Sequence, residues 1–543
     1  MVDPITLEIV RNQLLAAADD MRVGMVRSAF TPIIYEAGDC AVALLDERAD
    51  VLAQSSGLPM FLGNLEQAVK ASVELRGGPG TLREGDAVCL NDSYIQGTHL
   101  VDLTVFTPVF WEGALVGYTV ARADVTDVGG ADPGGGFATT EIYQEGLRMG
   151  PVLVEAEGEP VADILDIMRR NSRNGELLVG DVNAMVTACR IGEQRLRAVL
   201  DRVGVEQLRA IRDELFRQSE RLDRDAVAAI PDGVYRARGC LDDDGVVRGE
   251  PVWIDVALSV EGDRMSVDFT GTSGPVLGPL NTGVAQTISS VRVAYRLLFG
   301  GDRSPDGGSF RNLQVSVPEE SFLNAREPVA CMNYASSSVL LMDLIMRAFA
   351  DVVPDRVAAG QFGDAISQIV GTDPLTGGHF NLSEAHAGGW GADTAGDGAD
   401  GLIDLTNGSF RNTPVEVVES RYPVQVLEYA FRRGSGGAGR NRGGDGIVRR
   451  YRFDIDLDFY IWLDRIVTPA WGLFGGQPGA GSEAWVEGAT RRVQLTKANR
   501  FRIMAGEELV IATGGGGGYG DPGERLDALR VDDRSATMAG EER

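Results

Sequence analysis

Glycine is the residue that most constrains how this chain can fold. Seventy of the 543 residues are glycine, and they recur at no fixed period, which excludes a collagen-like repeat. They alternate with good apolar runs, so they do not indicate a disordered chain. Because glycine adopts backbone conformations closed to other residues and lets segments approach closely, we expect a folded backbone with many tight turns and close contacts.

The length and the order of patterns predict several packed units. A chain of 543 residues exceeds what one hydrophobic core usually serves. Strand-rich and helical blocks follow one another, which predicts an α+β fold with segregated antiparallel β blocks, helical blocks and glycine-rich turns. The expected units are an α+β unit at 1–160, a helical segment at 161–231, an α+β unit at 232–358, a glycine-rich, mainly β unit at 359–522 and a charged tail at 523–543.

Local patterns place individual elements within these units. Asp3 and Pro4 suit the N-cap and first position of a helix. Its apolar stripe is expected to run through Ile5, Ile9, Leu14, Met21 and Met25. Hairpins are expected from 40–45 with 51–53, and from 104–110 with 114–121; residues 233–317 are expected to be β-rich, and 337–353 helical.

Composition excludes several classes of function. With 79 acidic against 51 basic residues, the formal net charge is -28, which argues against a nucleic-acid partner. No apolar run approaches the roughly 18 residues that a membrane helix needs. The beginning, Met1 to Pro4, has neither a basic region nor an apolar signal stretch, so we expect a cytoplasmic protein.

Rare residue types narrow the chemistry further. The five cysteines are scattered without CxxC spacing, which argues against a disulfide framework and a structural zinc finger. Lysine occurs only at Lys70 and Lys497, and neither belongs to a GxxxxGK[ST] loop, so a P-loop ATP site is excluded. Histidine occurs only at His99, His379 and His386.

The densest candidate site lies on the second predicted hairpin. His99 and Asp102 are three residues apart beside a glycine, and Asp124 ends the next strand. If the turn centres near Glu112, Asp102 lies opposite roughly Arg122. Opposed Cβ atoms are about 4.5–5.5 Å apart and diagonal ones about 7–8 Å, so His99, Asp102 and Asp124 are predicted to converge.

Two carboxylates and one imidazole around a point are typical of a divalent metal site. Mn²⁺, Fe²⁺ and Zn²⁺ all accept such ligands. Without a cation, two close carboxylates repel and one of them retains a proton. The spacing leaves a second interpretation open, in which the aspartates cap turns and the histidine is structural.

The order of motifs along nearly the whole chain resembles the hydantoinase B family. That family includes B subunits of ATP-dependent hydantoinases, the matching half of 5-oxoprolinase, lactam-opening enzymes and the alpha subunit of acetone carboxylase. The segments that carry the resemblance are Asp3–Asn12, Asn91–Asp92 with Gly97–Asp102, Asp127–Gly130, Thr140–Arg148, Arg411–Glu416, Gly436–Gly439 with Gly443–Gly446, and the glycine run at 513–522.

The resemblance implies a four-residue metal site. Asp39, His99 and Asp102 match its first three positions, whereas Asp124 stands where relatives usually have histidine. A carboxylate in place of imidazole hardens the site, so among Mn, Zn and Mg we expect Mn²⁺ to be favoured. A second departure lies at 401–407, where relatives often have histidines.

The resemblance also implies a partner and a reaction. A hydantoinase A-type subunit would bind ATP and phosphorylate a carbonyl oxygen, and this chain would hydrolyse the activated cyclic amide within a hetero-oligomer. As a hypothesis of our own, beside what the resemblance implies, Asp127 or Glu141 would move protons and Arg122 would hold phosphate. Two alternatives stay open: a subunit of an ATP-dependent ketone carboxylase resembling acetone or acetophenone carboxylase, and a scaffold subunit without chemistry.

Overall fold

The computed structural model describes residues 2–301, 303–375, 377–408, 410–526 and 529. Helices and mainly antiparallel sheets occupy separate blocks of the chain, which confirms the predicted α+β class. Of the predicted tail, the described part includes the short 3₁₀ helix η5 (Pro522–Glu524), and most of residues 527–543 lie outside it. In the described part of the chain, no helix is both long enough and apolar enough to span a membrane.

The first helix, α1 (Pro4–Ser28), begins as predicted. The Asp3 carboxylate accepts a hydrogen bond from the Thr6 backbone N–H at 2.9 Å. The predicted stripe is wrong at its start, because Ile5 is 71% exposed and Ile9 is 38% exposed. The face that packs on the core begins instead with Leu7 and continues through Val10, Leu14, Ala17, Ala18, Met21 and Met25.

A seven-stranded sheet forms the N-terminal unit. In spatial order its strands are β2 (Val51–Gln54), β1 (Cys40–Asp46), β5 (Ala114–Asp124), β4 (Asp102–Trp111), β3 (Ala87–Leu90), β6 (Val152–Ala156) and β7 (Glu159–Pro160). The short helices of this unit are α2 (Pro32–Tyr35), α3 (Pro59–Leu62), α4 (Leu65–Leu75), α5 (Ser93–Gln96), and the 3₁₀ turns η1 (Pro79–Thr81), η2 (Pro133–Gly135) and η3 (Ile142–Gln144). Both predicted hairpins, β1–β2 and β4–β5, are present.

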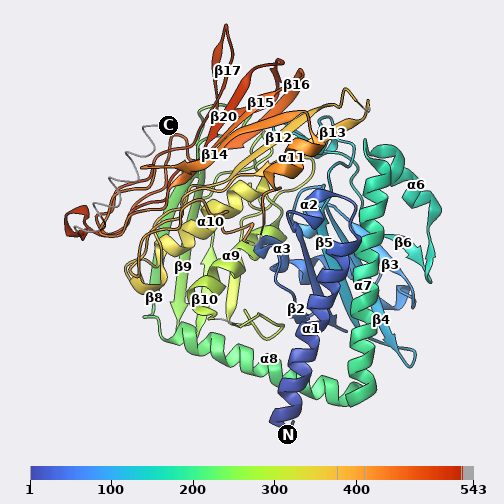
Figure 1. Ribbon diagram of the computed structural model, residues 1–543. Coiled ribbons are helices and arrows are strands. Elements are labelled where there is room, and N and C mark those ends of the chain that lie inside the picture. Colours follow the sequence, from blue (N-terminus) through green and yellow to red (C-terminus); the bar gives the residue numbers. More distant parts are fainter. Residues whose placement is uncertain (1, 302, 376, 409, 527–528, 530–543) are drawn as a thin grey trace.

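The predicted helical stretch forms three helices, α6 (Ala162–Asn171), α7 (Gly175–Val203) and α8 (Val205–Ala228). Helices α1 and α7 lie side by side over one face of the seven-stranded sheet (Figure 1), and apolar residues of α3 and α4 pack on the other face. Helix α8 then leads into the next unit.

The second unit is a four-stranded sheet covered by two helices. Its strands, in order, are β11 (Leu313–Ser316), β10 (Arg264–Asp268), β9 (Val252–Glu261) and β8 (Gly233–Leu241), with β10 and β11 parallel. The helices are α9 (Val284–Phe299) and α10 (Tyr334–Ala348), followed by the 3₁₀ turn η4 (Pro354–Arg356). The prediction of helix at 337–353 is therefore confirmed in the main, whereas α9 interrupts the stretch predicted to be β-rich.

Two sheets pack around one core in the C-terminal unit. One sheet contains β13 (His379–Ala385), β12 (Ala365–Thr372), β16 (Leu457–Leu463) and β19 (Lys497–Ile503); the other contains β14 (Val424–Arg432), β15 (Gly446–Phe453), β20 (Glu508–Ala512), β17 (Glu483–Glu487) and β18 (Arg492–Leu495). Apolar side chains of both sheets and of α11 (Val415–Arg421) share this core.

The glycine-rich segments of the C-terminal unit stack directly on one another. The backbone N–H of Gly437 donates to the carbonyl of Gly516 at 2.8 Å, and the N–H of Gly516 donates to the carbonyl of Gly444 at 2.9 Å. A Cβ atom on Gly516 would lie 1.9 Å from the carbonyl oxygen of Trp390. These backbones approach closely because glycine has no side chain, as the glycine content predicted.

Candidate metal centre

Three carboxylates meet where the ends of three neighbouring strands lie side by side. Asp102 is the first residue of β4 and pairs directly with Asp124, the last residue of β5. Asp39 immediately precedes β1, whose Cys40 pairs with Ala123 of β5. The Asp124 backbone N–H donates to the Asp39 carbonyl at 3.3 Å. Opposed residues of an antiparallel pair share one face, so the three carboxyl groups gather at one corner of the sheet.

A tight turn between α5 and β4 adds an imidazole to this corner. Gly97 ends α5 with φ +97°, and a Cβ atom there would lie 2.4 Å from the backbone nitrogen of Gln286 in α9. Beyond the turn, His99 Nε2 lies 3.2 Å from Asp102 Oδ1 and 3.3 Å from Asp124 Oδ2. One ligand atom from each of these three residues lies within 4.8 Å of the others.

The far side of the cluster is held by the segment that leads into α10. His99 Nδ1 lies 2.9 Å from the carbonyl oxygen of Met332 and donates to it, which leaves Nε2 facing the carboxylates. The Tyr334 hydroxyl donates to Asp102 Oδ2 at 3.0 Å, and its ring meets the imidazole edge-on. Buried Glu145 accepts from the backbone N–H groups of Cys331 and Met332, both at 2.8 Å.

Burial and the neighbouring charges shift the pKa values of the residues in this cluster. Burial, with the neighbouring Asp124 and Asp102, raises the pKa of Asp39 well above its usual value. Burial is also the main cause that raises the pKa of Asp124 to about 6. Burial acts to lower the pKa of His99, but the carboxylates of Asp102 and Asp124 outweigh it and raise that pKa well above its usual value.

The donor set fits a divalent cation. Oδ1 of Asp39 and Oδ1 of Asp102 are buried and have no hydrogen-bond partner among the described residues. Buried carboxylate oxygens normally have a partner, and a bound cation would supply it. The oriented imidazole offers a further lone pair at Nε2, so three or four hard-to-borderline ligands are available.

The cluster opens into a small cavity of about 60 Å³, larger than the roughly 10–15 Å³ that one water needs. Asp39 lines this cavity together with His99, Asp102 and Asp124. The remaining wall is largely apolar and includes Ile33, Met60, Phe61, Phe137, Met332 and Phe410. Polar groups on it come from Asn333, Tyr334, Asp364, Ser383 and Asn407, the last from the segment 401–407.

The three residues predicted to move protons or hold phosphate do not line this cavity. Asp127 is buried and paired with Arg173 at 2.7 Å, and its carboxylate accepts from three backbone N–H groups nearby. Glu141 is exposed and directly precedes the turn η3. Arg122 is fully buried, donates to Thr104 at 2.7 Å and to Asn64, and lies over the ring of Phe61.

The predicted pairing of the hairpin was wrong by two residues. Asp102 lies opposite Asp124, and Arg122 lies opposite Thr104. The two-residue turn is centred between Glu112 and Gly113, and a bulge beyond Val109 adds one residue to β5. The actual register brings the two aspartates closer than the predicted one.

Sequence reasoning missed the groups that complete the site from the C-terminal side. Met332 and Tyr334 follow the cluster by more than 200 positions, and Asp364 is further still. None of them belongs to a motif with metal-ligand or catalytic spacing. The departure noted at 401–407 was the one signal that pointed to this wall, through Asn407.

The chain is thus a multi-unit α+β protein with a carboxylate–imidazole cluster, and comparison with known sequences gives its family. The chain belongs to the Hydantoinase B/oxoprolinase family, whose model matches residues 3–522. It is similar to the caprolactamase subunit beta of Pseudomonas jessenii, with 30% identity over 96% of this chain and 91% of that protein. It is 28% identical to the 5-oxoprolinase of Saccharomyces cerevisiae over 96% of this chain and 42% of that longer protein.

Solved structures give the same relationship. The crystal structure of the ATP-dependent caprolactamase from Pseudomonas jessenii superposes with a TM-score of 0.90, at 28% identity, over 98% of this chain and 94% of that chain. Nucleotide-free acetone carboxylase superposes with a TM-score of 0.89 over 98% of this chain and 77% of that chain. Its identity is 20%, so this second likeness establishes the shared fold alone.

Proposed function

We propose that this chain is the B-type subunit of an ATP-dependent cyclic amide hydrolase. In this proposal an A-type partner subunit binds ATP and phosphorylates the carbonyl oxygen of the ring, and water attacks the activated carbon in the cavity described above. The observation that carries the proposal is the buried cluster of His99, Asp102 and Asp124 beside Asp39, in a chain similar to a caprolactamase subunit over nearly its full length.

The cluster residues would hold one divalent ion, with Mn²⁺ favoured because carboxylates outnumber the imidazole. Such an ion would lower the pKa of a water molecule and polarise a nearby oxygen atom. The protein's own contribution is orientation: the Met332 carbonyl fixes the tautomer of His99, and the Tyr334 hydroxyl fixes the Asp102 carboxylate. Apolar wall residues such as Phe61 and Phe137 exclude bulk water, which strengthens every charge interaction in the cavity.

The contacts do not support the proton-transfer roles predicted for Asp127 and Glu141. The Asp127 carboxylate forms an ion pair with Arg173, and Glu141 is exposed and does not line the cavity. Arg122 contributes a buried positive charge behind Asp102. Burial lowers the pKa of its guanidinium to about 10, which leaves the group charged at neutral pH.

The test is a reconstitution with the A-type partner. The purified complex, supplied with ATP and Mn²⁺, would be offered hydantoin, 2-pyrrolidinone, ε-caprolactam and 5-oxoproline, and separately acetone with bicarbonate. Ring-opened products and ADP are measured in the same samples. ATP-dependent opening of at least one ring supports the proposal; carboxylation of acetone without ring opening assigns the chain to the carboxylase alternative and contradicts it.

Changing Asp124 to histidine is expected to shift metal preference towards Zn²⁺. A second imidazole softens the ligand set, so we expect the Zn²⁺ to Mn²⁺ ratio bound from an equimolar mixture to rise by about tenfold or more. Elemental analysis of metal-depleted protein after incubation with both ions measures this ratio. Asp166→His, on the surface helix α6, is the matched control. An Asp124→His ratio equal to that of the control would show that Asp124 is not a ligand.

A further inference from the structure

The cavity has a carboxyl group that belongs to a different unit from the metal cluster. Asp364 directly precedes β12 of the C-terminal unit and lines the same cavity as His99 and Asp102. It is 4% exposed, and the Ser336 hydroxyl donates to its Oδ2 at 2.8 Å. A substrate in this cavity therefore lies between the cluster of the N-terminal sheet and a carboxyl group from the C-terminal sandwich.

Two further buried aspartates, Asp404 and Asp464, lie close enough for their charges to act on Asp364. Each of them has its own hydrogen-bond donors. Asp404 accepts from the backbone N–H of Thr406 at 2.8 Å, and from the backbone N–H and side-chain amide of Asn407 at 3.2 and 2.7 Å. Several donated hydrogen bonds stabilise a carboxylate in its charged form.

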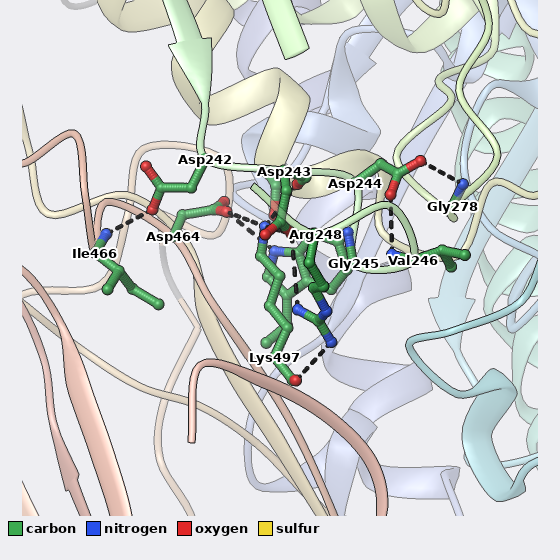
Figure 2. A network of polar contacts seen from close by, with 12 residues as sticks. Asp242, Asp243, Asp244, Gly245, Val246, Arg248, Gly278, Asp464, Ile466 and Lys497 are labelled. Atoms are coloured by element: carbon green, nitrogen blue, oxygen red, sulfur yellow. Dashed lines mark hydrogen bonds and ion pairs between the residues drawn. The ribbon is translucent and has the colours of Figure 1, made fainter. Parts of the chain in front are cut away.

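The second of these aspartates, Asp464, lies beside the buried Lys497 (Figure 2). Lys497 Nζ is 3.6 Å from Asp464 Oδ1 and 3.3 Å from Asp243 Oδ1, and the Trp462 indole N–H donates to Asp464 at 3.1 Å. Lys497 also donates to the Asp243 carbonyl at 2.7 Å, which fixes its position. The positive charge of this lysine is thus shared between Asp464 and Asp243.

Asp364 differs from Asp464 in its charged neighbours. Within the described residues, no arginine or lysine nitrogen lies within 4.0 Å of its carboxyl oxygens. Burial, followed by the charges of Asp404 and Asp464, raises the pKa of Asp364 well above its usual value. Burial raises the pKa of Asp404 and of Asp464 as well, but of the three carboxyl groups only that of Asp364 lines the cavity.

We propose that Asp364 donates a proton to the ring nitrogen of the substrate as the carbon–nitrogen bond breaks. This inference rests on the proposed function, because it assigns one step of that reaction. After water has added to the phosphorylated carbon, that carbon carries a hydroxyl, a phosphate ester oxygen and the ring nitrogen. The carbon–nitrogen bond breaks, its electron pair stays on nitrogen, and nitrogen takes the carboxyl proton of Asp364.

The step balances without a further reactant. The hydroxyl on carbon becomes the carbonyl of an acyl phosphate and releases its proton to water, and Asp364 regains a proton from water. A second water then cleaves the acyl phosphate to the carboxylate and inorganic phosphate. The products are the ring-opened carboxylic acid that carries the freed nitrogen, inorganic phosphate and the ADP left by the partner's phosphorylation step.

Protonation of nitrogen decides which bond breaks. An unprotonated amide nitrogen is a far poorer leaving group than phosphate. Without the acid, phosphate leaves first, the original ring amide re-forms, and ATP is consumed without product. Asp364 is therefore expected to control how tightly ATP use is coupled to ring opening, and general acids of this kind contribute about 10²–10⁴-fold to rate.

The experiment compares the wild-type complex with Asp364→Asn, using whichever of hydantoin, 2-pyrrolidinone, ε-caprolactam and 5-oxoproline the wild-type complex opens fastest. Asparagine keeps the acceptor for Ser336 but cannot donate an acidic proton. Phosphate and ring-opened product are measured in the same samples. We expect product to fall by about 10²–10⁴-fold while phosphate release falls far less, so that phosphate per product rises at least tenfold.

Controls separate this role from a structural one. Asp364→Glu is expected to restore part of the coupling, and Asp223→Asn, which neutralises a buried aspartate on α8, is expected to keep the wild-type ratio. An Asp364→Asn ratio equal to that of the wild type overturns the inference and leaves the proposed function standing. A wild-type complex that opens none of the rings overturns both.

Discussion

Replacing Asp102 with alanine is expected to remove the bound metal and to abolish ring opening. Asp102 has no exposed surface, and its Oδ1 makes the shorter of the two carboxylate contacts to His99 Nε2. Alanine leaves that nitrogen with Asp124 as its one remaining carboxylate neighbour within the described residues, and it removes the negative charge that favours charged Arg122. We expect about one divalent ion per wild-type chain and almost none in the variant. Activity with the partner subunit should fall by more than the about 10–100-fold typical of residues that only orient ligands.

Elemental analysis of both proteins, purified from cells supplied with Mn²⁺ and Zn²⁺, gives the first measurement, and the coupled ring-opening assay gives the second. Tyr334→Phe is the matched control, because it removes only the hydroxyl that holds Asp102 Oδ2. It is expected to keep the metal with about 10–100-fold lower affinity. A wild-type protein without metal, or a variant that retains it, would contradict the proposed centre and favour a scaffold subunit.

The sequence predicted those residues of the site that lie close to one another along the chain. His99 and Asp102 are three residues apart, and a hairpin connects Asp102 to Asp124, so strand geometry alone brings them together. The register was wrong because turn length and a bulge each shift pairing by one residue, and a hydrophobic pattern specifies neither. The error left the convergence intact because both aspartates stand at strand ends.

The part that could not be predicted depends on contacts between distant segments. Asp364 and Asn407 reach the cavity only because the C-terminal sheets pack against the N-terminal unit. Helix α9 was missed for a related reason. Its valines, isoleucine and threonine favour strands on local propensity, yet Val291, Ala294 and Tyr295 are buried on one helical face against α10 and the second sheet. Tertiary packing overrides such local preferences.

Changing Gly516 to alanine is expected to destabilise the C-terminal unit strongly. Gly516 sits between two other glycine segments, and a Cβ atom would lie 1.9 Å from the carbonyl oxygen of Trp390 and 2.6 Å from the backbone nitrogen of Gly391. Both are backbone atoms, and the Trp390 carbonyl also accepts a hydrogen bond from the Gly444 N–H at 2.8 Å, so neither yields as a flexible side chain would. We expect a cost of about 3 kcal/mol or more, at the upper end of what overpacking usually costs.

At about 2–4 °C per kcal/mol for a unit of this size, that cost lowers the midpoint of thermal unfolding by roughly 6–12 °C. Gly396→Ala is the matched control, because its Cβ would meet nothing within 4 Å. Gly506→Ala separates a second cause, since that glycine has φ +84° but open space around it, and it should cost only about 1 kcal/mol. Equal midpoints for the Gly516 and Gly396 variants would show that the stacked backbones can move apart, and that the terminal glycine run does not depend on close packing.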